Sequence, residues 1–170
     1  MSTEREFTAY VTGQLPRLRA IALGLCGDAH RADDVVQVAI TRLYLHWWRA
    51  RRAGDLDAYC RRIVVRTFLN EQRRRWAAVR LVGGPAELPQ AAGERPDVET
   101  RQVLRAALDR LPPKQRAVLV LRFLSDLPVA EVARAVGCSE ASVKGQTRHG
   151  LRRLRDLLGA RVPEWTEVHR

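Results

Sequence analysis

Apolar residues recur at helical spacing through most of this 170-residue chain, and no segment shows the apolar–polar alternation that marks a β-strand. In one clear stripe, Asp28 is well placed to cap a helix that carries Val36, Ile40, Leu43 and Trp47. Similar stripes cover about residues 7–25, 56–76, 103–111 and 117–124. The sequence therefore predicts an all-α fold.

Glycine and proline divide this helical pattern into two parts. Between Val82 and Pro96 no helical or alternating period survives. A stretch of this composition buries too little apolar surface to order itself. We therefore expect two small helical domains at residues 1–79 and 98–160, joined by a flexible linker at 80–97 and followed by a tail at 161–170.

A helix-turn-helix pattern begins at Val129. This motif needs a small residue where its helices touch, a glycine that adopts positive φ in the turn, and a branched apolar residue that fixes the second helix. Ala133, Gly137 and Val143 supply these features in the required order. Ser139 is well placed to cap the second helix.

The second helix of this pattern has an apolar face and a basic face. We expect its inward row to be Val143, Leu151, Leu154 and Leu158. The opposite face carries Ser142, Lys144, Gly145, Arg148, His149, Arg152 and Arg155. Such a helix can enter the major groove of DNA, where early residues reach base edges and arginines hold phosphates. The competing interpretation is a charged helix that only faces solvent, and the helix-turn core before it disfavours that interpretation.

The charge balance agrees with a nucleic-acid partner. The net charge is +11, and only Lys114 and Lys144 among the 30 basic residues are lysine. The planar donors of arginine suit phosphates and guanine edges. The sequence has no run of roughly 18 apolar residues, so no membrane span is predicted. The polar N-terminus does not resemble a signal peptide. We therefore expect a cytoplasmic protein without membrane association.

A metal site or a disulfide framework is not indicated. Cys26, Cys60 and Cys138 lie far apart and form no Cys-x-x-Cys pair, which is typical of buried cysteines in a reduced protein. We expect no metal and no cofactor.

Two segments of the first domain carry side chains that suit binding. Asp33, Asp34, Gln37 and Thr41 share one face of a helix whose other face is aliphatic. This face suits docking on a basic partner helix, and a plain solvated face is the alternative. In residues 56–76, six arginines interleave with Tyr59, Phe68 and Trp76, a mixture that suits phosphates and unpaired bases.

The aromatic residues of these segments have two interpretations. We expect Trp47 and Phe68 to belong to the core, whereas Tyr59 and Trp48 fit the core and the surface equally well.

Four segments resemble, in the right order, the extracytoplasmic-function (ECF) group of bacterial RNA polymerase sigma factors, which keep only sigma regions 2 and 4. They are residues 33–48, residues 56–76, LPPKQRAVLVLRF at 111–123 and SEASVKGQTRHGLRRLRDLL at 139–158. The phrase AYCRRIVVR brings the chain closest to the actinobacterial SigE-like subgroup. The resemblance covers about residues 7–158 and implies a region 2 bundle in the first domain and a region 4 helix-turn-helix in the second.

The resemblance implies a promoter-specificity subunit without catalytic residues. Its partners would be core RNA polymerase and promoter DNA, with an anti-sigma factor as a further partner. The polymerase would bind Asp33, Asp34, Gln37 and Thr41, with Val38 in place of the usual glutamate, and its flap would contact the apolar helix at 117–124.

The same resemblance assigns the DNA-binding residues. The −10 element would contact Arg51, Arg52, Asp55, Tyr59, Arg61, Arg62 and Arg66, and the loop at 49–57 would hold a flipped base. The −35 element would contact Ser142, Lys144, Gly145, Arg148, His149 and Arg152. Gly150, where the family usually has alanine, weakens the second helix by up to about 1 kcal/mol.

Three other functions compete with this interpretation. An enzyme is poorly supported, because His30 with Asp33 and Asp34 lacks a second ligand set and Gly83–Gly84–Pro85 is no phosphate loop. A sigma-like decoy that only binds an anti-sigma factor would be expected to lose the basic and aromatic residues that this chain keeps. A stand-alone helix-turn-helix regulator leaves residues 1–76 unexplained.

Overall fold

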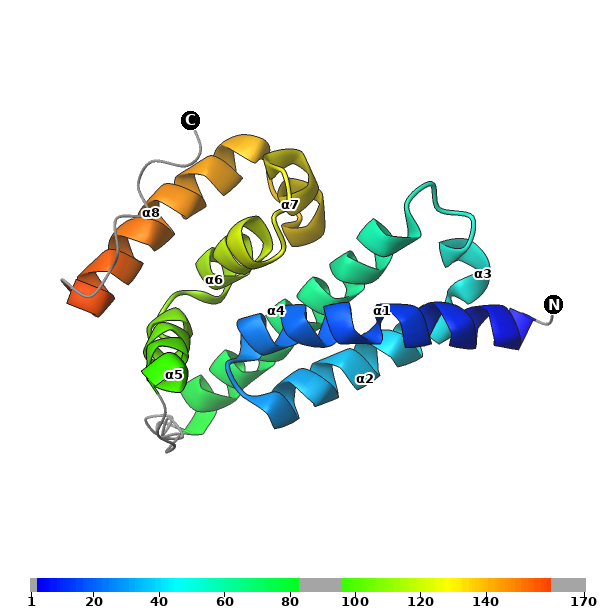
Figure 1. Ribbon diagram of the computed structural model, residues 1–170, viewed down its shortest axis with the longest axis horizontal. Coiled ribbons are helices and arrows are strands. Elements are labelled where there is room, and N and C mark those ends of the chain that lie inside the picture. The colour runs from blue at the N-terminus through cyan, green and yellow to red at the C-terminus, as the bar shows by residue number, and fades with distance from the viewer. Residues whose placement is uncertain (1–2, 83–95, 160–170) are drawn as a thin grey trace.

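The computed structural model describes residues 3–82 and 96–159, and both ranges are helical apart from short turns, with no strand in either. The elements are α1 (Thr3–Cys26), α2 (Ala29–Leu45), α3 (Trp47–Ala50), α4 (Leu56–Val82), α5 (Pro96–Asp109), α6 (Pro113–Leu119), the π-helical turn η1 (Val120–Leu124), α7 (Val129–Val136) and α8 (Glu140–Leu158). Figure 1 shows α1, α2 and α4 in one half of the molecule and α6, α7 and α8 in the other. The predicted all-α fold is confirmed.

Short polar side chains begin three of the helices, two of them, at Asp28 and Ser139, as the sequence predicts. Asp28 accepts a hydrogen bond from the backbone amide of Arg31 at 2.9 Å. Asp55 accepts one from Ala58 at 2.8 Å, and Ser139 accepts one from Ser142 at 3.1 Å. Each bond satisfies an amide that has no partner within its own helix, so these caps fix where α2, α4 and α8 begin.

The first half is built on α1, α2 and α4, whose facing surfaces are aliphatic. At their centre lie the fully buried side chains of Leu25, Leu43, Val64 and Phe68. Trp47 at the start of α3 is also buried, with the rings of Phe7 and Tyr10 at centroid distances of 5.2 and 5.6 Å. The expected core positions of Trp47 and Phe68 are therefore confirmed.

In the second half, α7 and α8 form the predicted helix-turn-helix. Gly137 has φ +77°, Ala133 is buried, and Val143 has no exposed surface. The positive φ is the conformation that glycine adopts without the cost a Cβ would impose. All three motif positions are confirmed.

The prediction of an inward row on α8 is wrong for one residue, Leu151. Leu151 is 37% exposed, whereas Leu154 and Leu157 pack against Leu108 and Leu119. Leu151 lies about 80° around the helix from Val143, and Leu154 lies only about 20° from it. Leu151 therefore falls outside the arc that α5 and α6 cover.

Gly150 allows α6 to approach α8 closely. A Cβ at this position would lie 3.0 Å from Cδ1 of Leu119, so the neighbouring side chain would have to move. The glycine thus has a packing role that its low helix propensity alone does not reveal.

The two halves share one apolar core. The cluster that contains Leu25 and Val64 of the first half also contains Val118, Leu121 and Val132 of the second. Helix α7 packs on α4, and η1 packs on α1. The closeness of the halves was not among the expectations from sequence.

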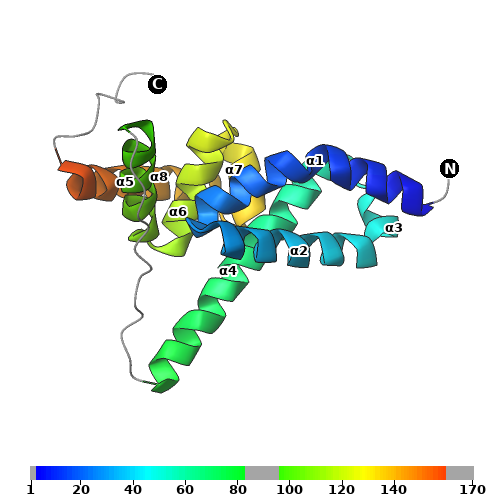
Figure 2. The ribbon, with the colours of Figure 1, turned by 60° about the horizontal axis from the view of Figure 1, so that its bottom comes forward.

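Two helices extend into the ends of the segment expected to be a linker, residues 80–97. Helix α4 continues to Val82 and α5 begins at Pro96. Residues 83–95, and the expected tail at 161–170, lie outside the described residues. Figure 2 shows that the C-terminal part of α4 extends away from the other helices.

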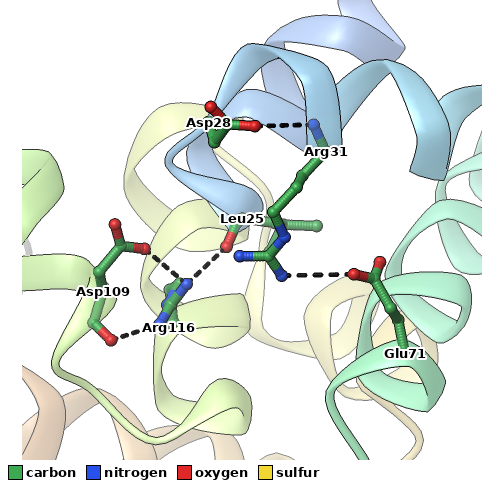
Figure 3. Close-up of polar contacts among 6 residues, drawn as sticks. All are labelled: Leu25, Asp28, Arg31, Glu71, Asp109 and Arg116. Carbon is green, nitrogen blue, oxygen red and sulfur yellow. Dashed lines mark hydrogen bonds and ion pairs between the residues drawn. The ribbon is translucent and has the colours of Figure 1, made fainter. Parts of the chain in front are cut away.

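A buried arginine joins the two halves where α1 ends (Figure 3). Arg116 is 5% exposed, and its Nη1 donates to the carbonyl oxygen of Leu25 at 2.9 Å and to Oδ1 of Asp109 at 2.7 Å. Its Nη2 donates to the carbonyl oxygen of Asp109 at 2.6 Å, and the guanidinium lies 5.8 Å from the ring centroid of Phe68. Burial lowers the pKa of Arg116 and raises the pKa of Asp109, although each charge opposes the shift of the other.

The turn between α1 and α2 leaves room for this ion pair. Gly27 has φ +69°, and a Cβ there would lie 2.5 Å from Oδ2 of Asp109. Only a residue without a side chain fits both the backbone conformation and the neighbouring carboxylate. Beside this cluster, Nη2 of Arg31 pairs with Oε1 of Glu71 at 3.4 Å.

Burial also raises the pKa of three groups in the first half. The Cys26 thiol has a pKa of about 12 and the Cys60 thiol a pKa of about 11, chiefly because desolvation disfavours their thiolates. The pKa of Tyr10 is raised by burial and by the hydrogen bond from its hydroxyl to Asp57 at 2.9 Å.

Among the helices of residues 3–82 and 96–159, none combines the length and the apolar character that a membrane span requires.

We predict that stability falls as the pH rises from about 9 toward 11. The unfolded chain loses its thiol protons near pH 9, whereas the folded chain keeps those of Cys26 and Cys60 to about pH 12 and 11. The folded state therefore binds more protons in this window, and the free energy of unfolding must decrease with pH. Thermal unfolding midpoints across this range test the prediction, with Cys26→Ala expected to show a weaker decline. A midpoint that stays level in the wild-type chain would contradict it.

Candidate functional site

The basic face of α8 is open to solvent. Lys144, Arg148, His149 and Arg152 are exposed, and Ser142 and Gly145 beside them are half-buried. Among the described residues, none of these cations forms an ion pair with an acidic side chain. The structure therefore brings together all six residues expected to contact the −35 element on one unobstructed helix face.

The early part of α8 is well suited to close approach by a ligand. A Cβ added to Gly145 would meet no atom within 4 Å, so space lies directly over the backbone there. The apolar face of the helix is held in place through Val143, which is fully buried. A rigidly seated helix with a free cationic face after a helix-turn-helix is the geometry that enters a major groove.

The polar face of α2 is exposed, with one of its four expected residues engaged elsewhere. Asp34, Gln37 and Thr41 are exposed. Asp33 accepts hydrogen bonds from Nε and Nη2 of Arg19 at 2.7 and 2.9 Å. The side chains of Asp34 and Gln37 are therefore free for a partner, whereas the Thr41 hydroxyl donates to the carbonyl oxygen of Gln37 at 2.9 Å and the Asp33 carboxylate already has a cation.

Apolar side chains extend this face of α2, which the sequence reasoning did not anticipate. Val38 is 43% exposed and Leu45 is 64% exposed. Both lie within about 40° of Asp34 around the helix. The exposed stripe of Asp34, Val38, Thr41 and Leu45 is thus part apolar, as the central part of a protein interface usually is.

An aromatic ring and two arginines lie together at α3 and the turn after it. Trp48 is 59% exposed, and the guanidinium carbons of Arg49 and Arg52 lie 5.8 and 6.0 Å from its ring centroid. The structure thus resolves the alternative for Trp48 in favour of the surface. Arg51 pairs with Glu6 at 3.4 Å.

The other expected −10 residues are distributed over α4 and its cap. Asp55 serves as the cap of α4, Tyr59 packs partly on the core, and Arg62 is half-buried. Arg66 is exposed one turn further along the same face. These side chains line the N-terminal half of α4 from the turn onward.

Arg61 is separated from this group by burial. Its exposure is 7%, and its Nη2 lies 2.9 Å from Oε2 of Glu131 on α7. In this arrangement the guanidinium pairs with the second half of the protein, in a cleft that residues of α4 and α7 line. Arg61 is thus the expected DNA-binding residue that the structure places furthest from solvent.

Two further exposed groups lie within segments that the sequence already assigned to a partner, the arginine-rich helix at 56–76 and the apolar helix at 117–124. Arg73, Arg74, Arg75 and Trp76 are all exposed on the extending part of α4 (Figure 2). At the end of η1, Phe123 is 43% exposed and Leu124 is 58% exposed. Residues 117–121 are buried, so the apolar helix expected to contact polymerase presents only its last turn.

The described residues contain no cluster of His, Cys, Asp and Glu side chains with the geometry of a metal site. The site consists instead of three surfaces: the α2 stripe, the α3–α4 face and the basic face of α8. The α3–α4 face is made of Trp48, Arg49 and Arg52 with Tyr59, Arg62 and Arg66 of α4. Surfaces of this kind bind macromolecules.

Comparison with known proteins identifies two family regions along the chain. The sigma-70 region 2 family matches residues 10–78, and the sigma-70 region 4 family matches residues 101–154. The chain is 34% identical to the RNA polymerase sigma-E factor of Streptomyces coelicolor over 159 residues, which cover 92% of this chain and 88% of that protein. This chain belongs to the ECF sigma factors.

A further relative supports the same family, and a solved structure supports the same fold. The ECF sigma factor EcfG of Rhodopseudomonas palustris is 30% identical over 150 residues, 87% of this chain and 82% of that protein. The sigma factor RpoE of Bartonella quintana, solved in complex with the anti-sigma factor NepR, has a TM-score of 0.74 at 24% identity and covers 93% of this chain and 99% of its own. The 34% identity to the sigma-E factor of Streptomyces coelicolor confirms the expected likeness to SigE-like sigma factors.

As an ECF sigma factor, the protein recognises promoters for RNA polymerase, and its partners are core polymerase and promoter DNA. Region 2 corresponds to α1–α4 and region 4 to α5–α8. The contacts expected of individual residues stay predictions.

Proposed function

We propose that this sigma factor docks on core polymerase through the α2 stripe, binds the −10 element with the α3–α4 face and reads the −35 element with α8. The basic face of α8 carries most of the support, because its cations are exposed, unpaired within the described residues and seated behind a helix-turn-helix. This chain supplies positioning and strand separation in the cytoplasm, and the catalytic chemistry belongs to the polymerase.

The three surfaces divide the work by their chemistry. The α2 stripe combines a carboxylate, a hydroxyl and aliphatic side chains, which suits a basic protein helix better than DNA. Trp48 with Arg49 and Arg52 offers a ring for an unpaired base and cations for its phosphates. Lys144, Arg148 and Arg152 suit duplex DNA.

A sigma-like decoy fits these surfaces less well. Such a protein has no use for an exposed cationic recognition helix, and the described part of this chain keeps one. An anti-sigma factor is proposed as a regulator of the active protein, supported by the solved relative that was captured with NepR.

Asp34→Arg should prevent binding to core polymerase while leaving affinity for −35 duplex DNA unchanged. The substitution places a cation on a surface proposed to face cations, and like-charge contacts cost several kcal/mol, so the affinity should drop at least about a hundredfold. Fluorescence polarisation of labelled protein with core polymerase measures the effect. Glu4→Arg makes the same charge change on exposed α1 and should bind normally, and equal losses in both variants would contradict the assignment of α2.

Arg148→Ala should weaken binding to the −35 element by roughly 1–3 kcal/mol and relax the preference at one base pair. Arg105 is exposed on α5, outside the proposed binding residues, so Arg105→Ala serves as the matched control. Binding of the holoenzyme to promoter variants with each upstream base replaced provides the measurement. A uniform loss across all sequences would instead assign Arg148 to a phosphate.

Replacing Arg73, Arg74 and Arg75 together by alanine should reduce the salt dependence of promoter binding. Each lost phosphate contact flattens the slope of log K against log salt by about 0.9, and alanine keeps the helix. The control replaces Arg101 and Arg105, which are exposed on α5, and Arg110, which is exposed in the turn after it. If both triple variants show the same slope, the extending end of α4 does not touch DNA.

A further inference from the structure

The turn between α3 and α4 is held at both ends by one side chain of α1, which lies beside α3 (Figure 1). Before the turn, Trp47 is buried at the start of α3, and its ring centroid lies 5.6 Å from that of Tyr10 and 5.2 Å from that of Phe7. After the turn, Asp57 in the first turn of α4 accepts a hydrogen bond from the Tyr10 hydroxyl at 2.9 Å. Tyr10 therefore contacts the chain on both sides of residues 48–56.

The carboxylate of Asp57 has a second donor on the same helix. Nε2 of Gln14 donates to its other oxygen at 3.3 Å, so each oxygen has one partner on α1. Tyr10 and Gln14 are four residues apart and thus share one face of α1. Hydrogen bonds that a carboxylate accepts are roughly twice as strong as those between neutral groups, so α1 holds the start of α4 firmly.

The middle of the turn faces solvent. Arg52, Gly54 and Asp55 are exposed, and a Cβ added to Gly54 would meet no atom within 4 Å. Arg51 pairs with Glu6 of α1 at 3.4 Å, but the two side chains are 42% and 45% exposed, and pairs of that kind contribute little stability. The position of the turn therefore depends chiefly on what holds its two ends.

The buried ring of Trp47 also decides which way the next residue faces. Because adjacent residues of a helix point about 100° apart, the burial of Trp47 directs Trp48 outward, where its side chain is 59% exposed. Arg49 and Arg52 lie beside the Trp48 ring on the α3–α4 face. Tyr10, which packs on Trp47, thus supports this face from behind without belonging to it.

From these contacts we propose that Tyr10 is a positioning residue for the capture of an unpaired −10 base. Its ring and its hydroxyl fix the two ends of the turn, so that Trp48, Arg49 and Arg52 are in the binding position before DNA arrives. This inference rests on the proposed −10 role of the α3–α4 face, whereas the hold on the turn follows from contacts within the chain. The apparent affinity for the base is the intrinsic affinity multiplied by the fraction of molecules in the competent conformation, so a looser turn weakens binding without loss of a DNA contact.

Tyr10→Phe is the test variant, because it removes the hydroxyl and keeps the ring that packs on Trp47. Tyr44→Phe is the matched control, since Tyr44 is an exposed tyrosine on α2, lies outside the proposed binding residues and has its ring 5.0 Å from that of Phe7. Both variants are reconstituted with core polymerase. They should bind it as the wild type does, because the α2 stripe is unchanged.

The DNA probe is a −10 fork whose non-template strand is single-stranded, with an abasic residue replacing each base in turn. The wild-type holoenzyme should lose most affinity at one position, which identifies the captured base. On the intact fork, Tyr10→Phe should bind about fivefold more weakly than Tyr44→Phe, within the range expected for the loss of one hydrogen bond. On the fork that lacks the captured base, the two variants should bind equally, because no base is left to position.

Asp57 provides a rescue by a conservative variant. Asp57→Asn keeps an oxygen that accepts from Tyr10 and should bind the intact fork within about twofold of the wild type. Asp57→Ala removes the acceptor and should bind as weakly as Tyr10→Phe. The double variant Tyr10→Phe with Asp57→Ala should lose no more than Asp57→Ala alone, since the two residues act through one bond.

The hold on the turn has a readout of its own in the free chain. Amide hydrogen exchange of residues 48–56 should be faster in Tyr10→Phe than in Tyr44→Phe, because the turn then opens more often.

The outcomes separate this inference from the proposed function. Equal losses on the intact and the abasic fork would mean that the Tyr10 hydroxyl only stabilises the fold, and they overturn the inference. It is also overturned if Tyr10→Phe binds the intact fork as Tyr44→Phe does. If the wild type loses no affinity at any abasic position, the proposed −10 role of the α3–α4 face fails and base positioning fails with it. Exchange in residues 48–56 then still decides whether Tyr10 holds the turn.

Discussion

A buried guanidinium needs a compensating charge and partners for its donors, since leaving it unpaired costs several kcal/mol. Arg116 obtains these from separate parts of the chain. Its contacts are the carbonyl oxygen of Leu25, the carboxylate and the carbonyl oxygen of Asp109, and the face of the Phe68 ring. The side chain thereby fixes how region 4 sits on region 2. The covered position of Arg61 and the open position of the α8 face both follow from that seating.

The features predicted correctly from sequence are those with local causes. Asp28 and Ser139 cap helices through bonds that span three residues, and the positive φ of Gly137 belongs to a turn whose helices flank it directly. The basic face of α8 was predicted because 3.6-residue periodicity assigns side chains to faces without reference to the rest of the chain.

What could not be predicted depends on which distant element covers a given face. Arg61 and Glu131 are 70 residues apart, and periodicity places each on a helix without pairing them. In the same way, Asp33 was expected to bind the polymerase, and Arg19 on α1 forms an ion pair with its carboxylate. Leu151 was expected inside because it is apolar, yet α5 and α6 cover a narrower arc of α8 than the apolar stripe suggests.

The absent methyl group at Gly150 sets a distance that matters for a subunit working between two large partners. Because Leu119 fills that space, α8 lies close against α6, which continues into the η1 turn that carries Phe123 and Leu124. The surface proposed to meet the polymerase and the surface proposed to enter the groove are therefore held at a fixed spacing. A bulkier residue at 150 would push these two surfaces apart without touching either partner.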